Sequence, residues 1–147
     1  MKTAWTLHTI VASAALAIGS LTLTAQTPDQ TVKATAPFGF EVGSQHFAPG
    51  VYTLRTPIEN VVMLRSRSKT TIIMTQWGES TRPSKTAKII FRRYGDHYFL
   101  RQIWFSAVDD SYLETPESKA EKQAKTSEFA SNQTRPSDVE VAMLRIP

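Results

Sequence analysis

The sequence predicts a mainly β protein: an antiparallel meander of six or seven strands that forms a small barrel or curved sandwich, with one helix in the C-terminal half. Three observations support this fold class. Short runs rich in β-branched and aromatic residues recur roughly every ten residues up to Phe105. A Gly-Asp hairpin signal joins the last two runs. After Leu113 the pattern becomes that of a helix. Closure is expected because an open meander would leave two exposed edges.

Six runs are predicted to be strands separated by Gly, Pro, Asn and Ser clusters. Pro37 can break the first run, because proline cannot donate a ladder hydrogen bond. Ala48-Pro49-Gly50 suits a type II turn, in which proline presets one φ angle and glycine accepts a positive one. The polar segment 65–69 is typical of a solvated hairpin end. The predicted strands are residues 32–42, 50–55, 61–65, 70–77, 87–94 and 97–105.

The dipeptide Gly95-Asp96 predicts the register of the clearest hairpin. A two-residue loop pairs Tyr94 with His97 and, counting outward, Ile90 with Arg101. Alternation along each strand then separates two faces. The predicted core face carries Ile89, Phe91, Tyr98, Leu100 and Trp104, with Arg93 and Gln102. The opposite face carries Lys88, Ile90, Arg92, Tyr94, His97, Phe99, Arg101, Ile103 and Phe105.

A helix and a final strand are predicted after the meander. Thr115-Pro116-Glu117 resembles an N-cap, a proline at the first helical position and a first-turn acid, and good helix formers follow. The helix is expected at about residues 116–130. It carries few apolar residues, so we expect it to lie on the surface. An alternating run at about 139–146 can return as the last strand.

The N-terminal segment predicts export. Lys2 precedes an apolar run of about 14 residues, which is typical of a secretory signal peptide and short for a membrane span. We expect residues 1–25 to be removed after Ala25, leaving a single β-rich domain at 26–147 in the periplasm or outside the cell. An uncleaved anchor is the alternative. The chain of 147 residues is 41% hydrophobic and lacks cysteine, which excludes disulfide frameworks and thiol catalysis.

Four motifs resemble those of a family of small exported bacterial proteins of unknown function. They are PFGFEVG at 37–43, FAPGVYTL at 47–54, FRRYGDHYFL at 91–100 and SKAE at 118–121. The resemblance covers nearly the whole chain after the predicted leader. It implies a compact β-rich domain and export, and it implies no catalytic or binding residues.

Catalytic and metal-binding patterns are weak. His46 and His97 lie near predicted turns, whereas a metal site usually needs three or four ligands. Ser66-Arg67-Ser68-Lys69 matches the S-x-x-K pattern of serine acylating enzymes, but here it joins two strands. Asp109, Asp110 and Glu114 form an acidic cluster that could serve a small hydrolase or lyase, alone or with His97. Helix entry and loop solvation are the favoured explanation of the cluster. No cofactor and no metal are expected.

A basic and aromatic face of the hairpin is the predicted binding site. Lys88, Arg92 and Arg101 alternate with Tyr94 and Phe99, a mixture that suits ring stacking and attraction to anions. Export argues against nucleic acid, so the expected partner is an anionic glycan, another envelope component or a protein. The alternative is that the helix or last strand covers this face. The sequence therefore predicts a non-catalytic binding module; a structural protein of the cell envelope that pairs through an exposed edge strand is the second hypothesis.

Overall fold

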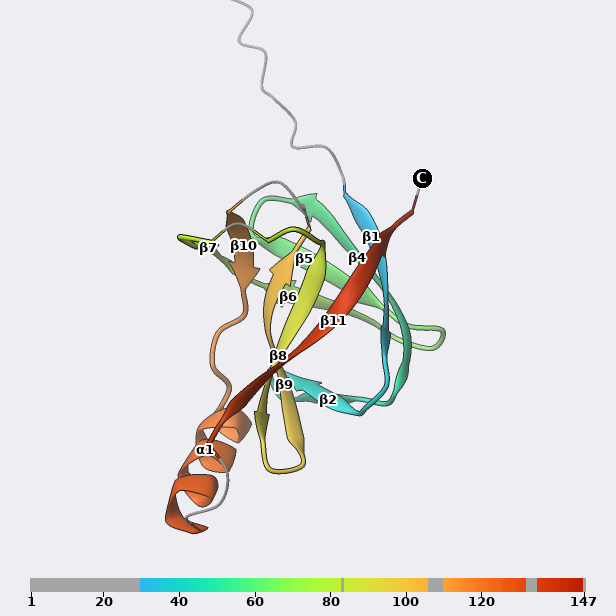
Figure 1. Ribbon diagram of the computed structural model, residues 1–147. Helices are drawn as coiled ribbons and strands as arrows, with labels where there is room; N and C mark the ends of the chain where they lie inside the picture. Colours follow the sequence, from blue (N-terminus) through green and yellow to red (C-terminus); the bar gives the residue numbers. More distant parts are fainter. Residues whose placement is uncertain (1–29, 83, 106–109, 132–134, 147) are drawn as a thin grey trace, which may run out of the picture.

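The computed structural model describes residues 30–82, 84–105, 110–131 and 135–146, which form one curled β-sheet and one helix (Figure 1). The predicted signal peptide lies outside these residues. Within them there are eleven strands and one helix. The elements are β1 Thr31–Ala36, β2 Phe40–Val42, β3 Gln45–Phe47, β4 Gly50–Ile58, β5 Val61–Arg65, β6 Thr70–Met74, β7 Gln76–Glu79, β8 Lys88–Tyr94, β9 His97–Trp104, β10 Ser111–Glu114, α1 Lys119–Ser131 and β11 Ser137–Arg145.

The sheet is an open half-barrel with mixed strand directions. Nine strands follow the order β3-β2-β9-β8-β11-β1-β4-β5-β6, while β10 pairs with both β7 and β9. The expectation of a mainly β chain with one helix is confirmed. The prediction of six or seven strands is wrong, because the run 32–42 divides around Pro37 and the run 70–77 divides at Thr75, and because β3 and β10 are too short to stand out in the sequence.

The prediction of a purely antiparallel meander is also wrong. Strand β2 runs parallel to β9 through the pair Glu41 and Phe99. Strand β11 lies between β8 and β1, which brings the C-terminal strand into the middle of the sheet. Such pairings join segments far apart in the chain, and short-range turn signals do not encode them.

Alternating side chains on the concave side of the sheet form the core. Its most deeply buried large side chains are Phe91, Leu54, Leu64, Ile103, Val32 and Val62. The Phe91 ring lies 5.0 Å from that of Phe40 and 5.2 Å from that of Phe38, measured between centroids. Aromatic residues of β2 and β8 therefore meet at one centre although they are about fifty positions apart in the printed sequence.

The β8–β9 hairpin confirms four predicted pairs and corrects the fifth. Register holds from Tyr94 and His97 to Phe91 and Leu100, but Ile90 pairs with Gln102 and leaves Arg101 in a β-bulge. The bulge moves every later side chain to the other face. Ile103 therefore enters the core, whereas Trp104 lies outside the main core cluster and stacks on Tyr112 at 4.9 Å.

Contacts of Thr115 explain both the bulge at Arg101 and why the helix starts later than predicted. Its hydroxyl donates to the carbonyl of Leu100, and its backbone N–H donates to that of Arg101 at 2.9 Å. Thr115 is thus used in the sheet and does not cap the helix. Ser118 is the cap, because its Oγ accepts the N–H of Glu121 at 3.0 Å. The helix therefore begins at Lys119, three residues later than predicted. The last strand, β11, spans Ser137–Arg145, whereas residues 139–146 were expected.

A glycine in β7 makes room for the ring of Tyr112 in β10. A Cβ atom at Gly78 would overlap the Cζ atom of Tyr112. We expect Gly78→Ala to push the ring off Trp104 and lower the free energy of unfolding by about 1–2 kcal/mol, measured by urea denaturation. In a Tyr112→Ala background the same substitution should be nearly neutral, and an equal loss in both backgrounds would contradict this account.

Candidate functional site

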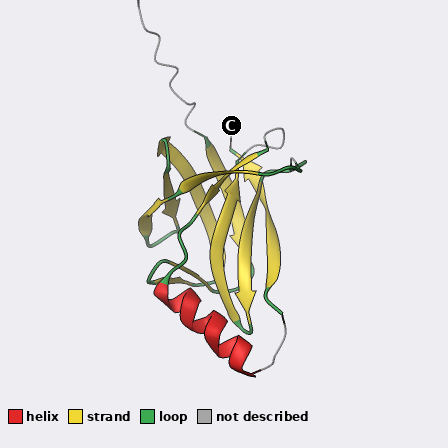
Figure 2. Cartoon of the chain, turned by 90° about the vertical axis from the view of Figure 1, so that its left-hand side faces the viewer, coloured by secondary structure: helices red, strands yellow, loops and turns green. Residues whose placement is uncertain are grey.

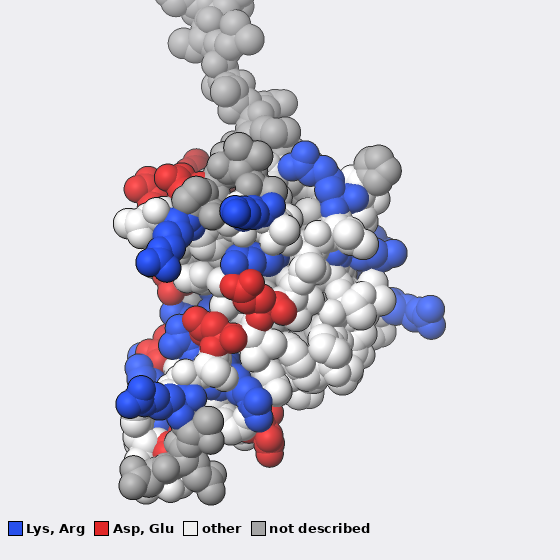
Figure 3. Space-filling model, in the orientation of Figure 1, with Lys and Arg blue, Asp and Glu red and all other residues white. Residues whose placement is uncertain are grey.

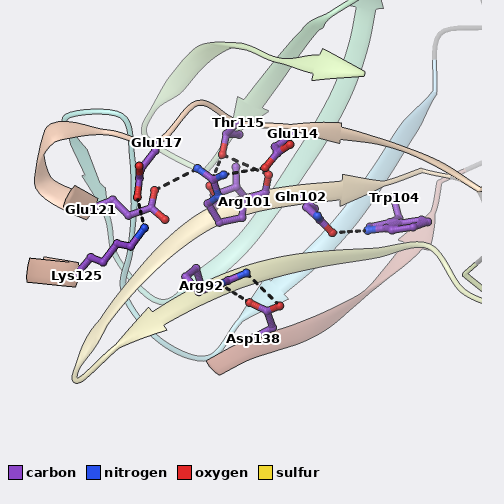
Figure 4. A network of polar contacts seen from close by, with 11 residues as sticks. Arg92, Arg101, Gln102, Trp104, Glu114, Thr115, Glu117, Glu121, Lys125 and Asp138 are labelled. Atoms are coloured by element: carbon purple, nitrogen blue, oxygen red, sulfur yellow. Dashed lines mark hydrogen bonds and ion pairs between the residues drawn. The ribbon is translucent and has the colours of Figure 1, made fainter. Parts of the chain in front are cut away.

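The three cations of the predicted binding face are all paired with acids, and Figure 4 shows the ion pairs of Arg92 and Arg101. Arg92 Nε lies 2.6 Å from Asp138 Oδ1, and Lys88 Nζ lies 2.7 Å from Glu140 Oε1. The antiparallel pairing of β11 with β8 places Asp138 directly opposite Arg92, and it places Glu140 opposite Ile90, one diagonal step from Lys88. Arg101 bridges Glu114 at 2.7 Å and Glu121 at 3.4 Å. We call this surface the neutralised face; its residues are Lys88, Arg92, Arg101, Glu114, Glu121, Asp138 and Glu140.

The two aromatic rings of the predicted site are buried on the same side of the hairpin. Tyr94 is 5% exposed and Phe99 is 2% exposed, and their ring centroids lie 6.0 Å apart. Helix α1 contacts β8 and lies at one end of the half-barrel (Figure 2). The structure thus brings all five predicted residues to one side of the β8–β9 hairpin, where the rings are buried and the charges are compensated.

Helix α1 is held against the hairpin by a buried carboxylate. Glu121 is its one buried residue, and burial raises the pKa of this carboxyl above its usual range while Arg101 opposes the shift. Burial also raises the pKa of the Tyr94 phenol, and the nearby Glu121 adds to the effect. The Arg101 side chain therefore acts as the counter-ion that keeps the helix in place.

The acidic cluster and the histidines are spread over the sheet. Glu114 is bound by Arg101, and Asp110 is exposed before β10, while Asp109 lies outside the described residues. His97 begins β9 and lies 3.5 Å from Glu41, whereas β10 pairs with β9 at Ile103 and Gln102 near its other end. Among the described residues, no group of three His, Asp or Glu side chains could hold a metal ion.

The S-x-x-K segment forms a β-turn between β5 and β6. Ser66 Oγ accepts the N–H of Lys69 at 3.1 Å, and the Ser66 N–H donates to the Lys69 carbonyl at 2.7 Å. The Lys69 amine lies over the Phe47 ring, 4.6 Å from its centroid. The hydroxyl thus stabilises the turn, and the amine makes a cation–π contact with β3.

A second group of cations, which sequence reasoning missed, lies on the opposite half of the sheet. Strands β1, β4, β5 and β6 are neighbours and contain no Asp or Glu. Pairing places Lys33, Thr53 and Arg65 in one row across β1, β4 and β5. We call this surface the basic face; its cations are Lys33, Arg55 and Arg65, with Arg67 and Lys69 in the adjoining turn.

The two faces differ in charge compensation. No ion pair within the described ranges engages Lys33, Arg65 or Arg67. In Figure 3, acidic and basic side chains alternate over β8 and β11, whereas the side formed by β1 and β4 shows Lys and Arg without neighbouring acids. Residues 30–78 hold five Lys or Arg against two Asp or Glu, and residues 79–147 hold eleven against ten. This uneven distribution was the available signal in the sequence.

An open groove adjoins the basic face. It has a volume of about 470 Å³ and lies between the β3–β4 connection and the β5–β6 turn. Its cationic lining residues are Arg67 and Lys69, with His46 on the β3 side, and no carboxylate lines it. Tyr52 closes part of the wall, because its hydroxyl donates to the carbonyl of Ala48 within the connection. The groove extends the positive surface around the hairpin end.

Comparison with known proteins gives no identification. No protein family, no curated protein and no solved structure matches the chain. Among the described residues, no helix is long and apolar enough to cross a membrane.

Proposed function

We propose that the protein is an exported, non-catalytic binding module that takes an anionic partner on the basic face. One observation carries the proposal: Lys33 of β1, Arg65 of β5 and the cations of the β5–β6 turn lie beside strands without acids, while Lys88, Arg92 and Arg101 of the other half are paired with acids. Uncompensated charge of one sign creates a field that attracts and orients ligands of the opposite sign.

The same proposal includes export, which the family resemblance implies, and it includes the class of ligand. A leader at residues 1–25 would deliver the domain to the periplasm or the cell exterior, where nucleic acid is not the expected ligand. Anionic glycans, other envelope components and acidic proteins remain as partners. The groove beside His46, Arg67 and Lys69 supports an anionic ligand, because amine, guanidinium and imidazole groups all donate hydrogen bonds.

The proposal predicts weaker retention on a polyanion when the basic face loses its charges. We expect the triple variant Arg65→Gln, Arg67→Gln and Lys69→Gln to elute from a heparin column at clearly lower salt than the wild type, because attraction between exposed charges is screened by salt. The melting temperature should change little, since all three side chains are exposed.

The control removes the same number of charges elsewhere. Lys85, Lys119 and Lys122 are exposed and lie in the loop before β8 and on α1. Their triple replacement by glutamine should shift the elution salt much less than the basic-face variant does. Equal shifts would mean that net charge alone governs retention, and the proposed site would then be wrong.

An assembly role in the cell envelope is the second candidate. Strand β6 ends the nine-strand path, and its sequence TTIIM carries no charge. Natural edge strands usually carry charges, prolines or bulges that prevent pairing with other chains. Self-association by β6 would appear as a concentration-dependent dimer in analytical ultracentrifugation.

A small hydrolase built on Asp109, Asp110 and Glu114 is the third candidate. It would require the Glu114 carboxylate to break its ion pair with Arg101.

A further inference from the structure

An exposed aliphatic patch lies on the same outer surface as the basic face. Pairing aligns Ile58 with Val61 and Val61 with Met74, and it places Met63 beside Ile72. Paired residues point to the same side of a sheet, so all five side chains share one surface. Ile58 is 65% exposed, Ile72 64% and Met74 65%. We call these five residues the aliphatic patch.

The aliphatic patch and the cations are contiguous. Arg55 pairs with Met63, and Arg65 lies two positions along β5 from Met63 on the same side. Between the start of β4 and the end of β6 the one acid is Glu59, which lies in the β4–β5 turn next to Ile58. Helix α1 packs on the β8 half, and within the described ranges no other element covers this surface (Figures 1 and 2). A partner of the surface must therefore offer both negative charge and an apolar phase.

We propose that this surface docks on an anionic lipid bilayer, an inference that rests on the proposed function and names its partner. Lys33, Arg65 and the turn cations would contact headgroup phosphates, and Ile58, Ile72 and Met74 would enter the acyl-chain boundary. Interfacial binding elsewhere combines buried apolar area with electrostatic attraction to anionic lipids in this way. Long cationic side chains reach headgroups while neighbouring apolar groups go deeper.

Two observations favour lipid over a glycan or an acidic protein. The aliphatic patch contains Ile, Val and Met but no aromatic ring, whereas the residues that dominate protein interfaces are Trp, Tyr and Arg. Aliphatic side chains also offer no stacking surface to a sugar. Strands β4 and β5, which carry three of the five patch residues, have ladder partners on both sides, so within the aliphatic patch a peptide could pair only along the edge of β6. Apolar contact with fluid chains needs no such pairing.

The test is sedimentation of the purified chain with lipid vesicles. We expect binding to vesicles in which half the lipid is phosphatidylglycerol and weak binding to phosphatidylcholine vesicles. The paired variant Ile72→Ser and Met74→Ser should lower partitioning about tenfold or more, because it removes exposed apolar area from the bilayer contact. The triple Gln variant of Arg65, Arg67 and Lys69 should lower it by about fivefold per charge.

Matched controls separate the surface from general hydrophobicity. Phe129 is 65% exposed on α1, so Phe129→Ser removes a comparable apolar group outside the surface and should leave partitioning unchanged. All variants share residues 1–29, so binding by that segment is the same in each. Circular dichroism verifies folding, which exposed substitutions should preserve.

The outcomes distinguish this inference from the proposed function. Suppose that the basic-face variant loses heparin retention while the Ile72 and Met74 variant binds vesicles as the wild type does. This result overturns lipid docking, but it still supports an anionic partner on the basic face. Unchanged heparin retention removes the proposed function itself. A wild-type dimer that the Ile72 and Met74 variant converts to a monomer assigns the patch to self-association and also overturns lipid docking.

Discussion

Replacing Phe91 by alanine is expected to lower the free energy of unfolding by about 3–5 kcal/mol. The side chain is 1% exposed at the centre of the core, and β8 around it pairs with both β9 and β11. Its ring contacts Phe38 and Phe40, which lie in the β1–β2 connection and in β2. The cavity would therefore be lined by elements on several sides that cannot all move inward. Urea denaturation measures the loss.

Phe129→Ala is the matched control for this prediction. It makes the same chemical change at a site that is 65% exposed on α1. We expect a change within about 0.5 kcal/mol, as for surface substitutions in general. A similar loss at both positions would indicate that the sheet does not enclose Phe91 as described.

Replacing Arg101 by alanine should cost about 2–3 kcal/mol, because it removes the counter-ion of a buried carboxylate. The Glu121 side chain is 4% exposed and that of Arg101 is 20% exposed. Arg92→Ala makes the same change next to Asp138, where both side chains are at least 40% exposed. It should cost less than about 1 kcal/mol. Urea denaturation of the two variants compares a buried pair with an exposed one.

A second substitution, at Glu121, and the pH dependence of stability test why Arg101→Ala is destabilising. Glu121→Gln removes the buried charge, so it should restore much of the stability of Arg101→Ala. Burial raises the pKa of Glu121, so the folded state holds this proton more tightly than the unfolded chain. The raised pKa of Glu121 therefore adds stability at a pH below the pKa of the unfolded chain, and this contribution is lost as the pH rises through the folded pKa. The cost of Arg101→Ala should thus grow from pH 4 to pH 7, and a constant cost would contradict the assignment.

The candidate site shows why a residue pattern alone misplaced the charges. Lys88, Arg92 and Arg101 are conspicuous in the sequence because they alternate with aromatic residues on one predicted strand face. Their acidic partners lie elsewhere in the chain, on β10, α1 and β11. Lys33 and Arg65 are less conspicuous, yet they come together because β1 and β5 both pair with β4. Whether a cation is paired with an acid depends on which strands lie side by side in the sheet, and local composition does not reveal this.

Short-range features were predicted well for a physical reason. The Gly95-Asp96 turn sets the register over its first four residue pairs, because a two-residue loop leaves the strands no freedom to slide. Register fails at Arg101, where the bulge depends on Thr115 from the segment after β10. A distant hydroxyl thus decides that Ile103, and not Trp104, joins the main core cluster.

Local features of the chain specify the β-rich character, the late helix, the main hairpin and the excess of cations in the first half. These properties follow from alternation, turn chemistry and composition, which act over a few residues. Long-range packing specifies the parallel β2–β9 pair, the central place of β11 and the separation of a neutralised face from a basic one. These features depend on contacts between distant segments, whose energies appear only once the chain has curled into a half-barrel.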